Sequence, residues 1–191
     1  MIVINEILNI ILYVFFNIPG ITGIKIRQVI LKFFFLETQA KIILHQSAEI
    51  RSIKNINFEG LVSFQKRCFI SAVNAKLIIG KNTHFNLENL VIADGGEITI
   101  GSNCIFGPRV IMRSVNHKYE NKNINIIDQG HKYNKILIED DVWIGAGSII
   151  LPGSIIRRGS VISAGSVVRG ETESYGVYSS YGDLKKIRSR S

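Results

Sequence analysis

The chain has 191 residues, of which 46% are hydrophobic and 20% are charged, and this balance excludes an intrinsically disordered protein. Its length suits a single domain with a substantial core. The 23 Lys and Arg residues outnumber the 15 Asp and Glu residues. The net charge of +8 favours anionic partners, such as a phosphate-bearing cofactor, a nucleotide- or lipid-linked sugar, or a membrane surface.

Two further classes are disfavoured by the absence of their motifs. No nucleic-acid recognition motif accompanies the positive charge, so we expect no nucleic-acid partner. Cys68 and Cys104 stand in no metal or redox spacing, and they do not indicate a secreted disulfide scaffold.

Residues 1–45 form an apolar and basic N-terminal segment, for which we predict short helices. Residues 7–16 are a dense apolar run of about half the length that spans a bilayer, without the basic start of a signal peptide. A break at Pro19–Gly20 precedes a second, amphipathic and basic stretch. Two interpretations stay open. Residues 1–36 either contact a membrane surface peripherally or cap the first coil of the repeat that follows. A transmembrane anchor is less favoured.

Residues 46–170 show a period of six, which is neither the helical nor the strand period. The period becomes legible at Ile79 and is strict from Ile138 to Val168, where every sixth residue is aliphatic. A small residue follows four positions later, directly after Gly, Asn or Asp, the residue types that tolerate positive φ. This pattern predicts a parallel β-helix of hexapeptides with 18-residue coils, in which the aliphatic residues point inward. Ile79 and Ile100 are three residues too far apart for one coil, which predicts a bulge near residues 94–96.

A long insert interrupts the repeat. The next coil after Met112 would begin at residue 118, but the register resumes only at Ile138. The polar residues between, about 113–136, are predicted to leave the body as a looping arm, and an insert of this length is usually functional. After Val168 the chain is expected to leave the β-helix as a basic C-terminal tail, residues 171–191.

Four sequence phrases together resemble the hexapeptide-repeat acyltransferases, most closely the galactoside and maltose acetyltransferases and related polysaccharide O-acetyltransferases. They are Asp141-Val-Trp-Ile-Gly-Ala-Gly-Ser with the following hexads, His84-Phe-Asn with Asp94-Gly-Gly, Ser114-x-Asn-His-x-Tyr119, and Gly182 with Lys185 and Lys186. The tail departs from the family by having Asp183-Leu184 where Pro-Ala is usual. The resemblance covers residues 50 to 190 and implies a left-handed β-helix, an all-β fold, assembled as a homotrimer.

The resemblance also implies a reaction, in which acetyl-CoA gives its acetyl group to a sugar hydroxyl within a ternary complex. His117 is the expected general base, since a positioned neutral imidazole suits removal of a hydroxyl proton near pH 7. Asn86 is expected beside it as a second catalytic residue. Acceptor-binding residues implied by the resemblance are Asp94, Asn116, Tyr119 and Trp143. Cofactor-binding residues so implied are Trp143, Gly145, Ala146, Ser163, Ala164, Lys185 and Lys186.

Alternatives remain for several of these assignments. His117 is otherwise a solvated loop histidine, and Asn86 and Asp94 are otherwise polar turn residues. N-acetylation of an amino sugar and a non-catalytic scaffold in a polysaccharide-assembly complex also remain open. A zinc enzyme is less favoured because the four histidines do not cluster in sequence, so we expect no metal. The expected setting is cytoplasmic, with peripheral contact to the inner membrane left open.

Overall fold

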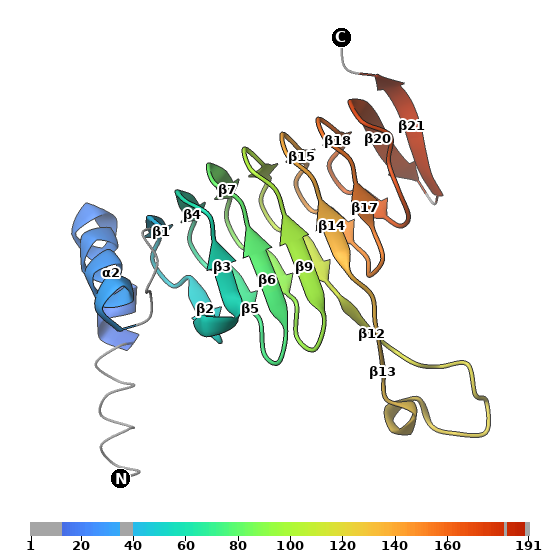
Figure 1. Ribbon diagram of the computed structural model, residues 1–191, viewed down its shortest axis with the longest axis horizontal. Coiled ribbons are helices and arrows are strands. Elements are labelled where there is room, and N and C mark those ends of the chain that lie inside the picture. The colour runs from blue at the N-terminus through green and yellow to red at the C-terminus, as the bar shows by residue number, and fades with distance from the viewer. Residues whose placement is uncertain (1–12, 35–39, 182, 190–191) are drawn as a thin grey trace.

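A computed structural model describes residues 13–34, 40–181 and 183–189 (Figure 1). These residues form a parallel β-helix of about six turns, as the hexads predict. Helix α2 (Gly20–Phe34) lies at the N-terminal end, and a hairpin of strands β20 (Gly176–Tyr181) and β21 (Asp183–Ser189) lies at the other (Figure 1). Residues 7–12 of the predicted apolar run lie outside the described residues.

The strands stack into three sheets that form the three faces of the solenoid. The first sheet contains β1 (Ile42–Leu44), β4 (Val62–Phe64), β7 (Thr83–Phe85), β10 (Ile105–Phe106), β15 (Trp143–Ile144), β18 (Val161–Ile162), β20 and β21. The second contains β2 (Glu49–Arg51), β5 (Phe69–Ser71), β8 (Leu90–Ile92), β11 (Ile111–Arg113), β16 (Ile149–Ile150) and β19 (Val167–Val168). The third contains β3 (Ile56–Phe58), β6 (Lys76–Ile79), β9 (Glu97–Ile100), β14 (Ile136–Ile138) and β17 (Ile155–Ile156).

The strict hexads behave as predicted. Ile138 pairs with Ile156 and Ile144 with Ile162, so one coil takes 18 residues. The aliphatic residues of these hexads are at most 1% exposed, because each points into the solenoid. The corner residues Asp141, Gly147 and Gly159 have φ of 58°, 69° and 70°, which explains the preference for Gly and Asp there.

The early coils are longer than the hexad period. His84 pairs with Ile105 and Lys76 with Glu97, an offset of 21 residues, and Phe69 pairs with Leu90 at the same offset. Strand pairing places the three additional residues between Val91 and Ile100, around the turn at residues 94–96 as predicted, and equivalent additional residues lie between Ile70 and Ile79 in the preceding coil. Longer corners carry them, and this is why the early sequence shows no clean six-residue period.

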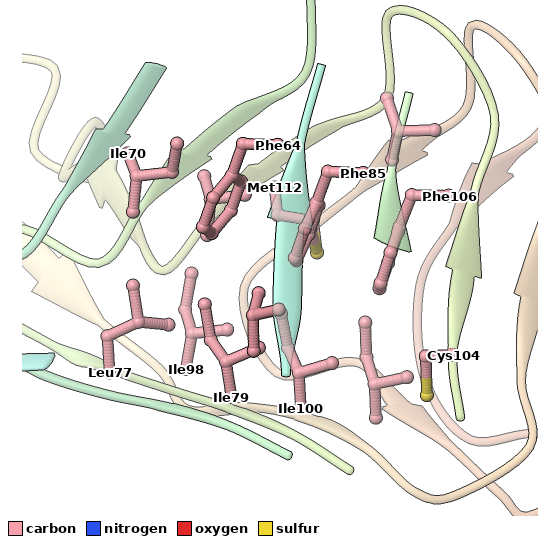
Figure 2. Close-up of a cluster of buried hydrophobic side chains, with 14 of the residues drawn as sticks. Phe64, Ile70, Leu77, Ile79, Phe85, Ile98, Ile100, Cys104, Phe106 and Met112 are labelled. Atoms are coloured by element: carbon pink, nitrogen blue, oxygen red, sulfur yellow. The ribbon is translucent and has the colours of Figure 1, made fainter. Parts of the chain in front are cut away.

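Stacked aromatic rings fill the core of the early coils (Figure 2). The rings of Phe64 and Phe85 have centroids 4.8 Å apart, and those of Phe85 and Phe106 are 4.5 Å apart at an angle of 5°. All three side chains are at most 1% exposed. The parallel register places the same residue type at the same inward position of successive coils, so the rings form a column along the solenoid axis.

Helix α2 covers the open end of the first coil. Leu31 joins the hydrophobic core, and Gln28 Nε2 donates to the carbonyl oxygen of Ile42 at 3.1 Å. Arg27 is fully buried and donates to the carbonyl oxygens of Leu44, Phe16 and Ile18 at 2.7, 3.0 and 2.9 Å. The described helical residues therefore act as a cap, one of the two interpretations that the sequence leaves open. Within the described part of the chain, no helix is long and apolar enough to cross a bilayer.

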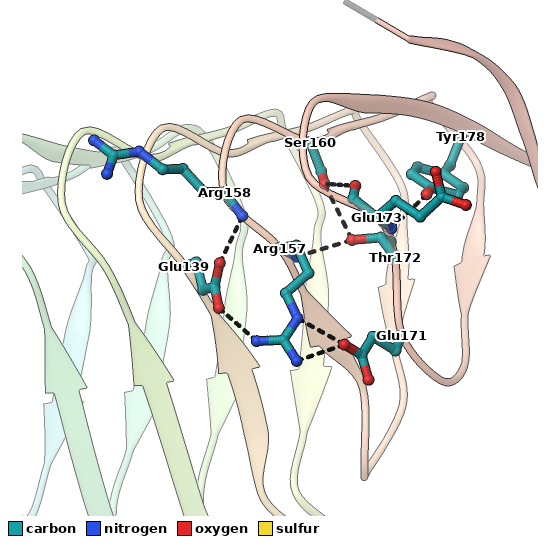
Figure 3. Close-up of polar contacts among 8 residues, drawn as sticks. All are labelled: Glu139, Arg157, Arg158, Ser160, Glu171, Thr172, Glu173 and Tyr178. Carbon is teal, nitrogen blue, oxygen red and sulfur yellow. Dashed lines mark hydrogen bonds and ion pairs between the residues drawn. The ribbon is translucent and has the colours of Figure 1, made fainter.

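The C-terminal residues do not leave the solenoid after Val168, contrary to the prediction. Strand β20 pairs in parallel with β18 and β21 pairs antiparallel with β20, so the first sheet continues to residue 189. Arg157 connects this end to the coil below, because it forms ion pairs with Glu139 at 2.7 Å and with Glu171 at 2.5 Å (Figure 3). The hydrogen bond from Arg157 holds the pKa of Glu139 below its usual value.

Candidate active site

An arm leaves the solenoid through β12 (Val115–His117) and returns through β13 (His131–Tyr133) before β14 (Figure 1). His117 is the last residue of β12 and so lies near the root of this arm. The arm begins as an antiparallel ribbon of β12 and β13, with the 3-10 turn η2 (Ile126–Gln129) in its outer loop. His117 is exposed, and its ring centroid lies 4.6 Å from that of His131. An exposed imidazole at this position is free to meet a substrate hydroxyl.

The arm ribbon has two distinct faces. Alternate residues of a strand share a face, so His117 shares one with Val115 and Asn116 lies on the other. Asn116 pairs with Lys132, and both are exposed. The ribbon therefore does not place Asn116 beside the His117 imidazole. Tyr119, just beyond β12, is 70% exposed.

Asp94 lies at the corner of the coil directly below the arm. Its Oδ1 accepts hydrogen bonds from Ser71 Oγ at 2.6 Å and from the amide of Val73 at 2.9 Å. The Asp94 carboxylate thus joins two successive coils, as the polar-turn alternative predicts. The neighbouring Gly95 contacts the arm, since a Cβ built on it would lie 2.4 Å from Tyr133 Cε1.

Asn86 lies at a different corner, between β7 and β8. Its Oδ1 accepts from the amide of Leu87 at 2.8 Å, and its side chain is exposed. On the outer face of the strand that precedes this corner, His84 Nδ1 lies 2.7 Å from Ser63 Oγ of the previous coil. Asn86 is therefore both a turn residue and an accessible amide.

Trp143 points outward from the first sheet, as predicted, and is 53% exposed. Strand pairing places it between Ile105, which is 54% exposed, and Val161. These side chains form an apolar strip on the outer face of the first sheet.

Small residues line the corner that follows this strip. Gly145 has no room for a side chain, because a Cβ there would lie 2.4 Å from the amide nitrogen of Ala164. The amides of Gly145 and Ser163 donate to the carbonyl oxygens of Ile162 and Tyr178. By contrast, the amides of Ala146 and Ala164 find no acceptor in the described part of the chain, and both residues are exposed. Two successive coils thus present two unused and exposed N–H donors along this edge.

The basic residues proposed at the C-terminus are placed only in part. Lys186 lies in β21 and forms an ion pair with Glu173, which raises the pKa of the Lys186 amine. Lys185 lies in the same strand, and Gly182 is outside the described residues.

The predicted residues fall into two groups at two edges of the solenoid. Asp94 and the arm lie at the edge between the second and third sheets. Asn86, Ala146 and Ala164 lie at the edge between the first and second sheets, next to Trp143. One chain does not bring these two groups together.

Two arm residues were missed by the sequence interpretation. His131 contacts the His117 ring, and the ring centroid of Tyr133 lies 6.2 Å from that of His131. The sequence held one signal for these two residues, the His-x-Tyr phrase at the end of the insert. If the insert folds as a hairpin, this phrase lies beside His117. Among the described residues, no group of three or more His, Cys, Asp or Glu side chains gathers to hold a metal ion.

Comparison with a protein-family model identifies residues 135–170 as the bacterial transferase hexapeptide of six repeats. A galactoside O-acetyltransferase of Lactococcus lactis is 38% identical over 93 residues, which cover 46% of this chain and 44% of that protein. The matched region thus spans less than half the length of this curated relative.

Two solved structures share the fold across most of the chain. One is a single-residue mutant of AntD, an N-acyltransferase from Bacillus cereus, in complex with dTDP and coenzyme A, with a TM-score of 0.72, 21% identity, and coverage of 86% of this chain and 89% of that one. The other is a hexapeptide-repeat acetyltransferase from Vibrio cholerae complexed with acetyl-coenzyme A, with a TM-score of 0.60, 22% identity, and coverage of 94% and 84%.

Proposed function

Because this chain belongs to the hexapeptide-repeat family, we propose that it is an acetyltransferase that uses acetyl-CoA to acetylate a sugar hydroxyl. The products are CoA and an O-acetyl sugar. The observation that carries the proposal is the exposed His117 at the root of an arm that interrupts the repeat. The similar galactoside O-acetyltransferase supports a sugar acceptor.

In the proposed reaction, His117 takes the proton of the sugar hydroxyl as that oxygen attacks the thioester carbonyl. The carbon–sulfur bond then breaks, and the imidazolium returns its proton to the departing CoA sulfur. The acetyl group passes directly between the two substrates, so no covalent enzyme intermediate forms. Asn86 is proposed to hold the acceptor beside the base, and Asp94, Asn116 and Tyr119 to bind its other polar groups.

The acyl donor is proposed to lie along the edge that carries Ala146 and Ala164. Their unused amides suit the carbonyl groups of a pantetheine arm, and the absence of a side chain at Gly145 lets a thin ligand approach. Trp143 offers an exposed aromatic surface beside them. Ser163 completes this corner, and Lys185 and Lys186 supply positive charge for phosphates.

The separation of the two residue groups supports an assembly of several chains. His117 and Ala146 lie at different edges of one solenoid, so a second copy must supply the missing edge. A homotrimer, in which each edge with His117 faces the donor edge of its neighbour, satisfies this requirement with one repeated interface.

A sugar N-acetyltransferase is the second candidate. The observation that favours it is the fold similarity to AntD, an N-acyltransferase, over 86% of this chain. A non-catalytic scaffold in a polysaccharide-assembly complex is the third, and it predicts no dependence of any activity on His117.

We also propose a cytoplasmic protein in cell-surface polysaccharide synthesis that contacts the inner membrane peripherally through residues 1–36. Tyr13, Val14, Ile21 and Val29 are exposed on the described helical residues, and Lys25 and Lys32 lie on α2 among them. Apolar and basic side chains together suit an anionic lipid surface. Sedimentation with phosphatidylserine-containing vesicles tests this contact, and Ile21→Ser is expected to weaken it.

The function is tested by CoA release from acetyl-CoA with a panel of free, lipid-linked and amino sugars. Wild-type protein is compared with His117→Ala and with Lys132→Ala, a control on the opposite face of the same ribbon. Acceptor-dependent release that is lost only in His117→Ala supports the transferase and its base. Release by His117→Ala at the wild-type rate contradicts the assignment of the base, and preferred transfer to amino sugars favours the second candidate.

A further inference from the structure

Three rings lie in a row on one face of the arm ribbon. His117 pairs across the ribbon with His131, with ring centroids 4.6 Å apart and an angle of 40°. Tyr133 lies two residues from His131 on the same face, with its ring centroid 6.2 Å away. Lys132 and Asn116 point to the other face, so the row is built by the alternation of the strands.

The register of the ribbon imposes the contact between the two imidazoles. The amide of Lys118 donates to Gly130 and the amide of Asn134 donates to Ser114, each at 3.0 Å. The first bond is next to the His117–His131 pair and the second is three pairs away. Because hydrogen-bonded pairs alternate along an antiparallel ladder, both bonds make His117–His131 a non-hydrogen-bonded pair, the kind whose side chains approach most closely. The two rings meet because of where the strands pair.

The row is attached to the solenoid through Tyr133. Its ring lies on Gly95, where an added Cβ would be 2.4 Å from Tyr133 Cε1. Ser114 Oγ donates to the carbonyl oxygen of Ala93 at 3.1 Å, which fixes the root of the arm on the same corner. Val115, opposite Tyr133, is 5% exposed. The row thus begins on a rigid coil and ends at His117.

We propose that His131 is a positioning residue for His117, held in turn by Tyr133 and Gly95. This inference rests on the proposed role of His117 as the base. An exposed histidine samples several χ1 rotamers, and a general base must hold its nitrogen within hydrogen-bond reach of the proton it removes. The His131 ring occupies one side of the His117 imidazole and so removes the rotamers that would point there.

The kinetic test compares His131→Ala, His131→Phe and the control Lys132→Ala, using acetyl-CoA and the best acceptor of the panel. His131→Ala is expected to lower kcat by about 10- to 100-fold, because a displacement of about 1 Å at a reacting group has an effect of that size. The KM for acetyl-CoA is expected to stay unchanged. His131→Phe keeps a ring at the same place and is expected to restore kcat to within about threefold of wild type. If the His131 imidazole nitrogens were themselves required, this variant would be as slow as His131→Ala.

A second readout needs no acceptor and separates this inference from the proposed function. Nuclear Overhauser contacts between the ring protons of His117 and His131 are expected in the wild type. In His131→Phe, contacts from His117 to the ring protons of the introduced phenylalanine should replace them. In His131→Ala, the His117 ring should give averaged χ1 couplings.

Two results would overturn the positioning role. One is a single His117 rotamer in His131→Ala, and the other is wild-type kcat in that variant while His117→Ala is inactive. Wild-type activity of His117→Ala overturns the base instead, whatever the ring contacts show.

Discussion

The guanidinium Nε of Arg27 donates to the carbonyl oxygen of Leu44 at 2.7 Å, which ties helix α2 to the first strand of the solenoid. The same side chain binds the carbonyl oxygens of Phe16 and Ile18, where residues 13–17 end as a helix. One buried cation therefore supplies hydrogen-bond donors both to a helix end and to a sheet edge. Burial lowers the pKa of Arg27, but its carbonyl partners stabilise the charged form.

Arg27→Met is expected to lower the free energy of unfolding by about 2–4 kcal/mol, because it leaves several buried carbonyl oxygens without a donor. Lys25→Met on the same helix is the control, with an expected change within about 0.5 kcal/mol. Urea unfolding followed by circular dichroism measures both. Equal stabilities of the two variants would show that water replaces Arg27 as the hydrogen-bond donor to these carbonyl oxygens.

Both cysteine thiols are expected to be unreactive in the folded protein. Burial raises the pKa of Cys68 and of Cys104 to about 11, so neither forms an appreciable amount of thiolate at about pH 8. Labelling by a disulfide reagent should require denaturant. Rapid labelling of the native protein would contradict the burial of these thiols.

The same shift predicts a loss of stability in alkali. In the unfolded chain the thiols ionise near their ordinary pKa of about 8.5, whereas in the folded protein they keep their protons to about 11. The unfolded state therefore binds fewer protons between these values, and the free energy of unfolding falls as pH rises through that window. Cys68→Ala with Cys104→Ala should flatten the decline, which unfolding curves between about pH 8 and about pH 10.5 would detect.

Phe85 lies between two other rings in the core column, with Phe64 on one side and Phe106 on the other. Phe85→Ala is expected to lower the free energy of unfolding by about 3–5 kcal/mol, through lost burial and the cavity that remains. Leu87→Ala, at a side chain that is 39% exposed, is the control and should change it by less than about 1 kcal/mol. Similar losses in both variants would argue against a packed column.

Gly95 and Gly130 form a matched pair for testing the contact between arm and coil. Both have positive φ, of 73° and 77°, but only Gly95 has a neighbour, Tyr133, in the space of a Cβ. Gly130→Ala is expected to cost about 1–3 kcal/mol of backbone strain, because φ of 77° and ψ of −153° lie in a region that is essentially restricted to glycine. Gly95→Ala adds the displacement of the Tyr133 ring, so proteolysis should cut its arm faster than that of Gly130→Ala. Equal rates would show that the ring does not hold the arm.

The corner at Ala146 permits a test of the proposed donor site without disturbing the fold. Pro108 occupies the corresponding position one coil earlier, because Phe106 pairs with Ile144, so this corner geometry accepts proline. Ala146→Pro removes one unused amide donor and is expected to raise the KM for acetyl-CoA about 2- to 10-fold with no loss of stability. Ala146→Ser keeps the amide and is the control. An unchanged KM would place the donor elsewhere.

The solenoid was predictable where local sequence dictates it. From Ile138 to Val168 each inward and each corner position recurs with one period, so the register follows from counting residues. The early coils have 21 residues, and their register could not be counted in this way because their longer corners break the six-residue period. Arg27 was not predicted as buried, since its partners are backbone carbonyl oxygens that no sequence pattern displays.

The candidate site, like the solenoid, was predictable only where the local sequence dictates it. His117 was placed at the root of the arm because the interruption of the period marks that root. His131 was missed because its contact depends on pairing between two strands across a long loop without a turn signature. Recognising the separation of Asn86 from the arm also required the three-sheet topology. The hexads imply three sheets, but they do not show which two sheets each corner joins.

The arm leaves the solenoid and returns at one point, where the amide of Asn134 donates to the carbonyl oxygen of Ser114 at 3.0 Å. That bond closes the coil beneath the arm, so arm length and coil register are independent of each other. The segment between these two residues can therefore be shortened, lengthened or exchanged while the stacking of the coils beneath it stays unchanged.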